Sequence, residues 1–391
     1  MASSGKWRFI RFLPFILILP FIFSGFQLSR LQNSKPKGDG SVGVGRKKFD
    51  YIVLGPAAGQ GLPNRIQCQG LKAVKRRPLP SFHLSLVKEK ISFVTVFTIY
   101  NQSLQISFDQ KVSTNVSVGN STYDKTQRSM AILNVFANFI KVAMPRSNIF
   151  ILTDPASNFP VVPSNAVVMH IPGDYSRNNL MLQRIKSYID FLEARLSGHI
   201  GKQNQVDHFI FTDSDIAVVD DLGDVVENYP DFHIGLTFRN NKDQPLNSGF
   251  ILVRGTDEAV SKAKAFLEEV LEIYKSMFMK AARMLGDQLA LAWIVKNQPL
   301  FDAQRFRNPK AFVAEVHRAQ VLFLPCAIYN WTPPEGAGQF HGMPEDVKVI
   351  HFKGSRKRLM MESWNFFNSH PVDFSDMMCL ILKSGRVKYD F

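Results

Sequence analysis

The chain has few cysteines, and it lacks several sequence motifs that would have indicated a type of binding site directly. Of its 391 residues only Cys68, Cys326 and Cys379 are cysteine, so at most one disulfide forms and no zinc pattern is present. Because Cys68 lies in a basic N-terminal region, the expected pair is Cys326 with Cys379. The glycine cluster at 55–61 matches neither the dinucleotide-binding fingerprint nor the P-loop, and it is typical of a turn. No internal repeat occurs.

A basic excess is also missing from most of the chain. The formal net charge is +14, but residues 1–90 hold 16 Lys and Arg against 3 Asp and Glu, whereas residues 91–391 hold 31 against 30. A nucleic-acid-binding protein would be expected to place its basic surface on the folded part. The sequence therefore predicts no nucleic-acid partner and assigns the charge to the N-terminal region.

No apolar run is long enough to be an ordinary membrane span. The longest, at 12–23, is short and contains Pro14 and Pro20. It follows three basic residues, as in a cleaved signal peptide or an uncleaved signal anchor. Bulky residues precede the small residues at which cleavage would occur, which favours the anchor. Basic residues on its N-terminal side predict a single-pass type II protein, and the short span suits a Golgi membrane.

This reading divides the chain into three parts. We expect a cytosolic tail with the signal anchor at 1–28, a stem at 29–90 and a luminal domain at 91–391. Four glycosylation sequons agree with luminal exposure, although each is weak support on its own. They begin at Asn101, Asn115, Asn120 and Asn330.

From Ile91 onward, apolar runs of strand length alternate with amphipathic stretches of helix length. The predicted strands are 91–98, 148–153, 209–212, 216–219, 233–237 and 249–253, and the predicted helices are 129–142, 179–196, 258–279 and one starting near 287. Such alternation predicts an α/β fold with a mostly parallel twisted sheet flanked by helices. Ligands bind at the carboxyl ends of the strands in such sheets.

Asp213-Ser214-Asp215 interrupts two apolar runs at such an end. In extended backbone, residues i and i+2 point to the same side, which would bring the two carboxylates together. Paired carboxylates repel and are costly to desolvate, and a divalent cation with a preference for oxygen ligands removes that cost. A polar turn between two strands is the plain alternative, because Asp-x-Asp also arises by chance.

Four features then follow in a fixed order. They are Asp213-Ser214-Asp215, Asn247-Ser248-Gly249, Gly286-Asp287-Gln288 and His351-Phe352-x-Gly354-x-x-Lys357. This order resembles the retaining nucleotide-sugar glycosyltransferases of the GT-A fold. The resemblance is to glycosyltransferase family 8, the glycogenin and galacturonosyltransferase group, with family 77 as the near alternative. It covers roughly residues 91–360.

The resemblance implies roles for individual residues. The metal ligands would be Asp213, Asp215 and His351, a set that suits Mn²⁺ better than Mg²⁺, although Mg²⁺ is possible. Facing the donor diphosphate would be Gly354 and Lys357, and facing the donor sugar and acceptor would be Asn247, Asp287, Gln288 and Arg184. Strand position alone suggests Thr95 and Thr98 as contacts of the nucleotide.

Each residue also has a structural interpretation. Asn247-Ser248-Gly249 is a common turn tripeptide, Asp287 could cap a helix, His351 could be a core histidine, and Arg184 could pair with a neighbouring carboxylate.

The expected activity is the transfer of a sugar from a nucleotide diphosphate, in the first instance a UDP-sugar, to a glycan or other hydroxyl acceptor with retention of configuration. A catalytically silent scaffold in a Golgi complex and a glycan-binding lectin are the alternatives.

Overall fold

The computed structural model describes residues 90–99, 116–118, 121–159, 162–200, 207–241, 243–281, 284–299, 301–333, 346–357 and 360. All of them belong to one compact unit. The predicted tail and anchor, and the predicted stem apart from Lys90, lie outside the described residues, as do the sequon asparagines Asn101, Asn115 and Asn120. None of the described helices is both long and apolar enough to cross a membrane. The division at residue 90 stays a prediction.

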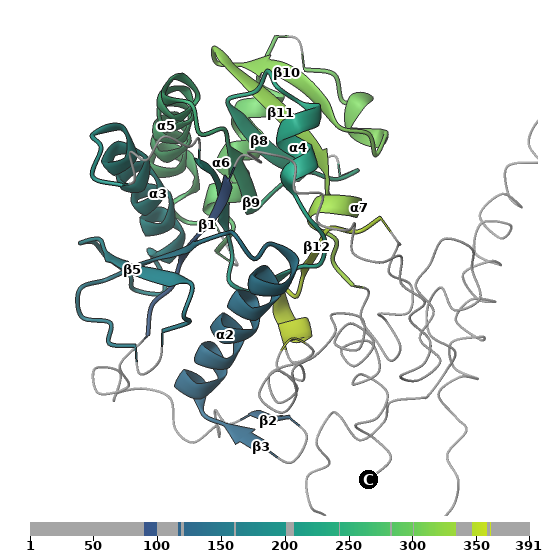
Figure 1. Cartoon of the computed structure of the whole chain (residues 1–391). Coiled ribbons are helices and arrows are strands. Elements are labelled where there is room, and N and C mark those ends of the chain that lie inside the picture. The colour runs from purple at the N-terminus through teal and green to yellow at the C-terminus, as the bar shows by residue number, and fades with distance from the viewer. Residues whose placement is uncertain are drawn as a thin grey trace, which may run out of the picture. The chain divides into compact units, whose positions relative to one another are not determined.

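An eight-stranded sheet forms the centre of this unit (Figure 1). Its order is β10-β11-β8-β9-β6-β1-β4-β5. Six of these strands run in one direction, and β9 and β10 run against them. The bounds are β1 Lys90–Val96, β4 Ile149–Thr153, β5 Ala166–His170, β6 Asp207–Thr212, β8 Ile234–Phe238, β9 Leu246–Val253, β10 Phe312–Val316 and β11 Ala319–Pro325. The mostly parallel α/β sheet predicted from the sequence is thus confirmed.

Helices cover both faces of the sheet. Phe93 packs into an apolar cluster with α2, whereas its neighbour Val94 packs into a second cluster with α3, α5 and α6. This follows from the alternation of side chains along a strand. The helices are α2 Lys125–Ala143, α3 Leu180–Leu196, α4 Gly223–Asn228, α5 Asp257–Ile273, α6 Gly286–Lys296 and α7 Cys326–Tyr329, and a π-helical turn, η2, continues α5 over Tyr274–Phe278. The start of α2 is fixed by a capping box between Asp124 and Gln127.

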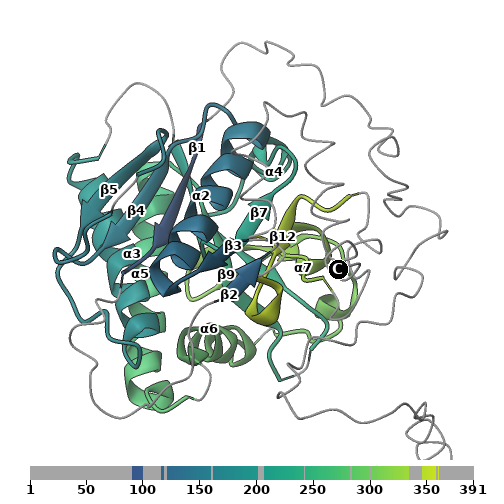
Figure 2. The ribbon, with the colours of Figure 1, turned by 90° about the horizontal axis from the view of Figure 1, so that it is seen from below.

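A small second sheet lies beside the large one (Figure 2). Strand β7, Ile216–Val218, leaves the main sheet directly after β6 and pairs antiparallel with β12, Val349–His351. Trp331 extends the pairing through a bridge to Ile350. A short hairpin-like pair, β2 Val116–Val118 and β3 Ser121–Tyr123, is separate from both. The pairing of β7 with β12 joins chain segments more than 130 residues apart in sequence.

One expectation about local structure was wrong. Residues 247–249 are not a turn, because they lie inside the buried strand β9, where the pairing with β8 shifts at a bulge. Bulges redirect side chains and are frequent beside functional sites. Cys326 has a free thiol in this structure, with a pKa that burial raises to about 11. Its expected partner Cys379 lies outside the described residues, so the pairing stays a prediction.

Candidate functional site

The two aspartates lie in the tight turn that joins β6 to β7. Strand β6 ends at Thr212, whose hydroxyl donates to the Gly249 carbonyl at 2.9 Å, and the Asp215 carbonyl accepts from the backbone N–H of Phe352 at 2.8 Å. The carboxylates therefore come together through a turn, not through the extended backbone expected from the sequence. Asp215 is buried, and Asp213 is about one-third exposed.

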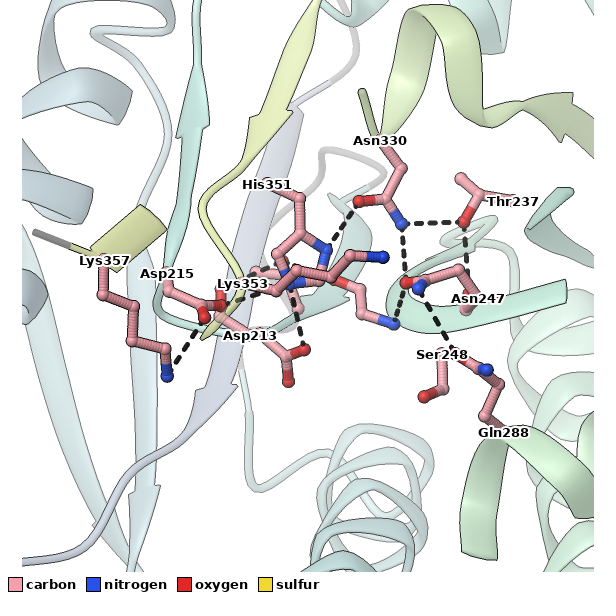
Figure 3. Close-up of polar contacts among 12 residues, drawn as sticks. Asp213, Asp215, Thr237, Asn247, Ser248, Gln288, Asn330, His351, Lys353 and Lys357 are labelled. Atoms are coloured by element: carbon pink, nitrogen blue, oxygen red, sulfur yellow. Dashed lines mark hydrogen bonds and ion pairs between the residues drawn. The ribbon is translucent and has the colours of Figure 1, made fainter. Parts of the chain in front are cut away.

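His351 reaches this turn because β12 pairs with β7 in a register that places it opposite Ile216. Its Nε2 lies 3.6 Å from Asp213 Oδ2 and 3.3 Å from Asp215 Oδ1 (Figure 3). One ligand atom from each of the three residues lies within 4.8 Å of the others. Two carboxylates and an imidazole form a donor set that fits Mn²⁺. The three predicted metal ligands are thus brought together by the fold.

The close approach of these side chains requires glycine at 249. A Cβ atom added there would lie 2.6 Å from His351 Cε1 and 2.8 Å from Asp213 Oδ2. Real Cβ contacts are not that short, so any side chain would displace the histidine or the aspartate. The absence of a side chain at Gly249 therefore leaves the space that His351 and Asp213 occupy.

Lys357 contacts the second carboxylate oxygen of Asp215. Its Nζ lies 3.1 Å from Asp215 Oδ2, and its side chain is 48 % exposed (Figure 3). Burial raises the pKa of Asp215, but the neighbouring imidazole of His351 and the ammonium group of Lys357 outweigh burial and hold that pKa well below its usual value. The charge of Asp215 in turn raises the pKa of Lys357. The acid and the lysine are thus held as an ion pair.

Gly354 begins the short 3-10 turn, Gly354–Arg356, that precedes this lysine. Its φ of +67° is in the left-handed region that favours glycine, and a Cβ added there would meet nothing within 4 Å. The backbone here is therefore open to the approach of a ligand.

Arg184 lies deeper, between two carboxylates. Its guanidinium forms ion pairs with Asp213 and Asp287 and donates to Ser248 Oγ at 2.9 Å. Burial lowers the pKa of Arg184, but the two carboxylates reverse the effect and raise it well above its usual value. Asp287 is almost completely buried in the first turn of α6. Helices α3 and α6 thus deliver a charged pair to the same edge of the sheet.

A chain of amide side chains completes the site. Asn247 Nδ2 donates to Gln288 Oε1 at 3.2 Å, and Gln288 Nε2 donates to Gln244 Oε1 at 3.0 Å. On its other side, Asn247 Oδ1 accepts from Asn330 Nδ2 at 2.8 Å (Figure 3). Asn330 Oδ1 lies 2.8 Å from His351 Nδ1. Every residue that the resemblance assigned to the metal or the donor sugar therefore belongs to one connected group.

The two nucleotide-contact candidates are placed differently. Thr95 is completely buried within β1, and the Thr98 hydroxyl donates to Asp154 Oδ2 at 2.6 Å beside Ser157. Burial raises the pKa of Asp154, but hydrogen bonds from Ser157 and Thr98 outweigh it and lower the pKa overall. Thr95 thus lies inside the sheet and the Thr98 hydroxyl is bonded to Asp154, and their contact with a nucleotide stays a prediction.

Asn330 was not predicted as a site residue, because in the sequence it is the first residue of a glycosylation sequon. Its side chain is only 3 % exposed and is fully used in hydrogen bonds, so it is not available as a glycan acceptor in the folded chain. This sequon therefore lends no support to luminal exposure. One feature of the sequence could have indicated that Asn330 belongs to the site. The apolar run that forms β11 ends at Pro325, so Asn330 follows the carboxyl end of a strand, where ligands bind in such sheets.

Comparison with known proteins gives similarity in structure only. No protein-family description and no curated protein matches the sequence. One similar solved structure is a glycosyltransferase involved in the glycosylation of the major capsid of PBCV-1. The two chains share 10% identity with a TM-score of 0.39, over 70% of this chain and 99% of that one. Another is the glycosyltransferase GlyE of Streptococcus pneumoniae TIGR4, at 11% identity and a TM-score of 0.38, over 75% of this chain and 62% of that one. At these scores the function has to be argued from the site.

Proposed function

We propose that this chain is a metal-dependent glycosyltransferase that moves a sugar from a nucleotide diphosphate, in the first instance UDP, to a hydroxyl acceptor with retention of configuration. One observation carries the proposal. A carboxylate pair and a histidine, Asp213, Asp215 and His351, meet at the carboxyl edge of an α/β sheet beside the lysine of a Gly-x-x-Lys segment.

The residues present fit a divalent cation. Asp213, Asp215 and His351 would hold it, and the imidazole favours Mn²⁺ over Mg²⁺, which prefers oxygen ligands alone. A bound cation supplies positive charge that stabilises the departing diphosphate.

The protein's own groups then have distinct tasks. Lys357 places a positive charge where negative charge grows on the diphosphate, and Gly354 leaves space for the phosphates to approach. Asn247 and Gln288 present amides suited to sugar hydroxyls, and the Arg184–Asp287 ion pair lies next to them, in contact with Ser248. These groups bind and orient the donor.

In the proposed step, the bond between the anomeric carbon and the diphosphate oxygen breaks, and a bond to the acceptor oxygen forms on the same face of the sugar. The acceptor proton passes to the leaving diphosphate. Asp213, Asp215 and Asp287 are each engaged with a cationic partner or a histidine, which disfavours a role as nucleophile. A front-face displacement is therefore preferred to a double displacement through a glycosyl-enzyme.

The proposed location is a Golgi membrane, with type II topology and the catalytic part in the lumen. It rests on the basic residues and the apolar run at the N-terminus, and on the nucleotide-sugar chemistry proposed here. A catalytically silent scaffold is the second candidate; the intact group of Asp213, Asp215, His351 and Lys357 speaks against it, because a scaffold has no need for these side chains.

The test is hydrolysis and transfer by the purified full-length chain against a panel of nucleotide sugars, with Mn²⁺ and with a chelator. Release of the nucleotide diphosphate that depends on Mn²⁺ and on one donor supports the enzyme, and the panel names the sugar. Asp220→Asn, an exposed carboxylate outside the group, is the matched control for Asp215→Asn. A chain that binds acceptor but turns over no donor would favour the scaffold or a lectin.

A further inference from the structure

Asn330 links the three candidate metal ligands to the row of hydrogen-bonded amide side chains. Its side chain contacts His351, Thr237 and Asn247, all through atoms that can donate or accept (Figure 3). A terminal amide can present either its oxygen or its nitrogen to a given neighbour, so its orientation must be derived from the hydrogen bonds around it.

A backbone group that can only donate determines this orientation at one end of the row of amide side chains. The backbone N–H of Gly249 can only donate, and it lies 2.9 Å from Asn247 Oδ1, which must therefore be the oxygen. Asn330 approaches the same oxygen at 2.8 Å and must present its nitrogen. The second hydrogen of that nitrogen is taken up by Thr237 Oγ1 at 3.0 Å, since the Thr237 hydroxyl itself donates to the Asn247 carbonyl at 3.1 Å.

A second fixed donor agrees from the far end. The guanidinium of Arg239 can only donate, and it does so to Gln244 Oε1 at 3.1 Å. Gln288 Nε2 donates to the same oxygen, which leaves Gln288 Oε1 to accept from Asn247 Nδ2. Both ends of the amide chain therefore impose the same direction on every hydrogen bond in it.

With its nitrogen committed, Asn330 turns its oxygen to His351. An oxygen accepts, so His351 Nδ1 must carry a hydrogen. Whenever the ring is neutral, its lone pair is therefore on Nε2, which lies 3.6 Å from Asp213 Oδ2 and 3.3 Å from Asp215 Oδ1, where a cation held by the carboxylates would meet it. That is the tautomer a metal-binding histidine needs, because the cation binds the unprotonated nitrogen while the other is held by a hydrogen bond.

We propose that Asn330 is a positioning residue that fixes the metal-binding tautomer of His351 and ties it to Asn247, so that metal and donor sugar are bound by one hydrogen-bonded unit. The proposal rests on the proposed function, since it takes His351 as a metal ligand and Asn247 as a donor contact. It also assigns the Asn330-Trp331-Thr332 sequon a role unrelated to glycosylation.

Two variants separate the two tasks of Asn330. Asn330→Leu is close in volume but makes no hydrogen bond, and Mn²⁺ affinity should fall about 10- to 100-fold, as is usual when the hydrogen-bond partner of a metal-bound histidine is lost. Asn330→Asp still accepts from His351 Nδ1 but faces Asn247 Oδ1 and Thr237 with acceptors only. It should keep Mn²⁺ affinity close to the wild-type value and weaken binding of the donor nucleotide sugar about tenfold.

The measurements are Mn²⁺ binding, followed by the loss of the free-ion electron paramagnetic resonance signal, and UDP-sugar binding by calorimetry, on the full-length chain. Thr332→Ala is the matched control, because it abolishes the same sequon without touching the network. Wild-type affinities for Thr332→Ala support the proposal, whereas a loss equal to that of Asn330→Leu would overturn it in favour of a glycan effect.

Wild-type Mn²⁺ affinity in Asn330→Leu would also overturn the proposal. If that variant does not fold, Asn330→Asp decides: a loss of Mn²⁺ affinity in Asn330→Asp refutes a role in positioning, because its carboxylate still accepts the hydrogen of His351 Nδ1. A wild-type chain that binds neither Mn²⁺ nor Mg²⁺ would instead remove the proposed function, and the role of Asn330 with it.

Discussion

Removing the amine of Lys357 should change metal binding and nucleotide binding in opposite directions. In the structure, Lys357 Nζ lies 3.1 Å from Asp215 Oδ2, on the carboxylate that a cation would use. Lysine and cation thus compete for Asp215 until a diphosphate supplies the lysine with another partner. Lys357→Ala should therefore bind Mn²⁺ alone more tightly and the Mn²⁺–UDP pair more weakly.

The expected changes in affinity for the cation alone and for UDP differ in size. The Lys357 side chain is 48 % exposed, so solvent screens the ion pair and its loss is worth about 1 kcal/mol, roughly a fivefold gain in affinity for the cation alone. A charge-assisted contact with a phosphate is worth about 1.5–3 kcal/mol, so UDP affinity should fall roughly 10- to 100-fold. Turnover should fall at least as far, because negative charge on the diphosphate is greatest in the transition state.

Calorimetric titration of Mn²⁺, and then of UDP at saturating Mn²⁺, measures both effects on one sample. Lys353→Ala is the matched control, since it removes a positive charge from the same segment outside the Gly-x-x-Lys spacing. Equal and small effects of the two substitutions would refute the assignment of Lys357 to the diphosphate. A loss of Mn²⁺ affinity in Lys357→Ala would refute the competition.

Three further changes test other parts of the site. Asp215→Asn should abolish most Mn²⁺ binding and activity without changing the melting temperature by more than a few degrees; unchanged Mn²⁺ affinity would show that Asp215 is not a ligand. Gly249→Ala should cost about 1–3 kcal/mol in unfolding free energy and weaken Mn²⁺ binding, because its Cβ would lie 2.6 Å from His351 Cε1. Gly354→Ala, whose Cβ meets nothing within 4 Å, should cost only the strain of a positive φ, about 1–2 kcal/mol, and leave Mn²⁺ affinity unchanged. A chain starting at Lys90, the first residue of β1, should stay soluble and folded by circular dichroism; insolubility that a start near Arg46 reverses would assign the stem to the fold.

The sequence predicted the regular parts of the fold well because they are governed by local periodicity. The helices at 125–143 and 180–196 repeat their apolar residues at the spacing of one buried face, and the strands around Phe93 and Ile151 are nearly continuous apolar runs, as is typical of strands buried on both faces. Strand β9 was predicted too short, because the polar pair Asn247-Ser248 interrupts an otherwise apolar run. Only the bulge against β8 allows those polar groups to lie within a buried strand.

The residues of the site were visible as motifs, but their arrangement was not. The pairing of Ile216 with His351 joins segments that no local pattern relates, and it is what brings the histidine to the aspartates. Asn330 was hidden for a different reason, since the Asn-x-Thr pattern describes three residues of sequence and says nothing about burial. Both are results of tertiary packing.

The small sheet formed by β7 and β12 also makes the site depend on a segment that is synthesised more than 130 residues after the two aspartates. Asp213 and Asp215 are in place once the central strands have formed, but His351 and Lys357 arrive only when residues 346–357 dock. A cation shared between the two segments would hold them together, and at a hundred times its dissociation constant it would add about 2.7 kcal/mol to their docking. Under the proposed function, the supply of metal would therefore regulate how firmly this segment is closed as well as how fast the enzyme works.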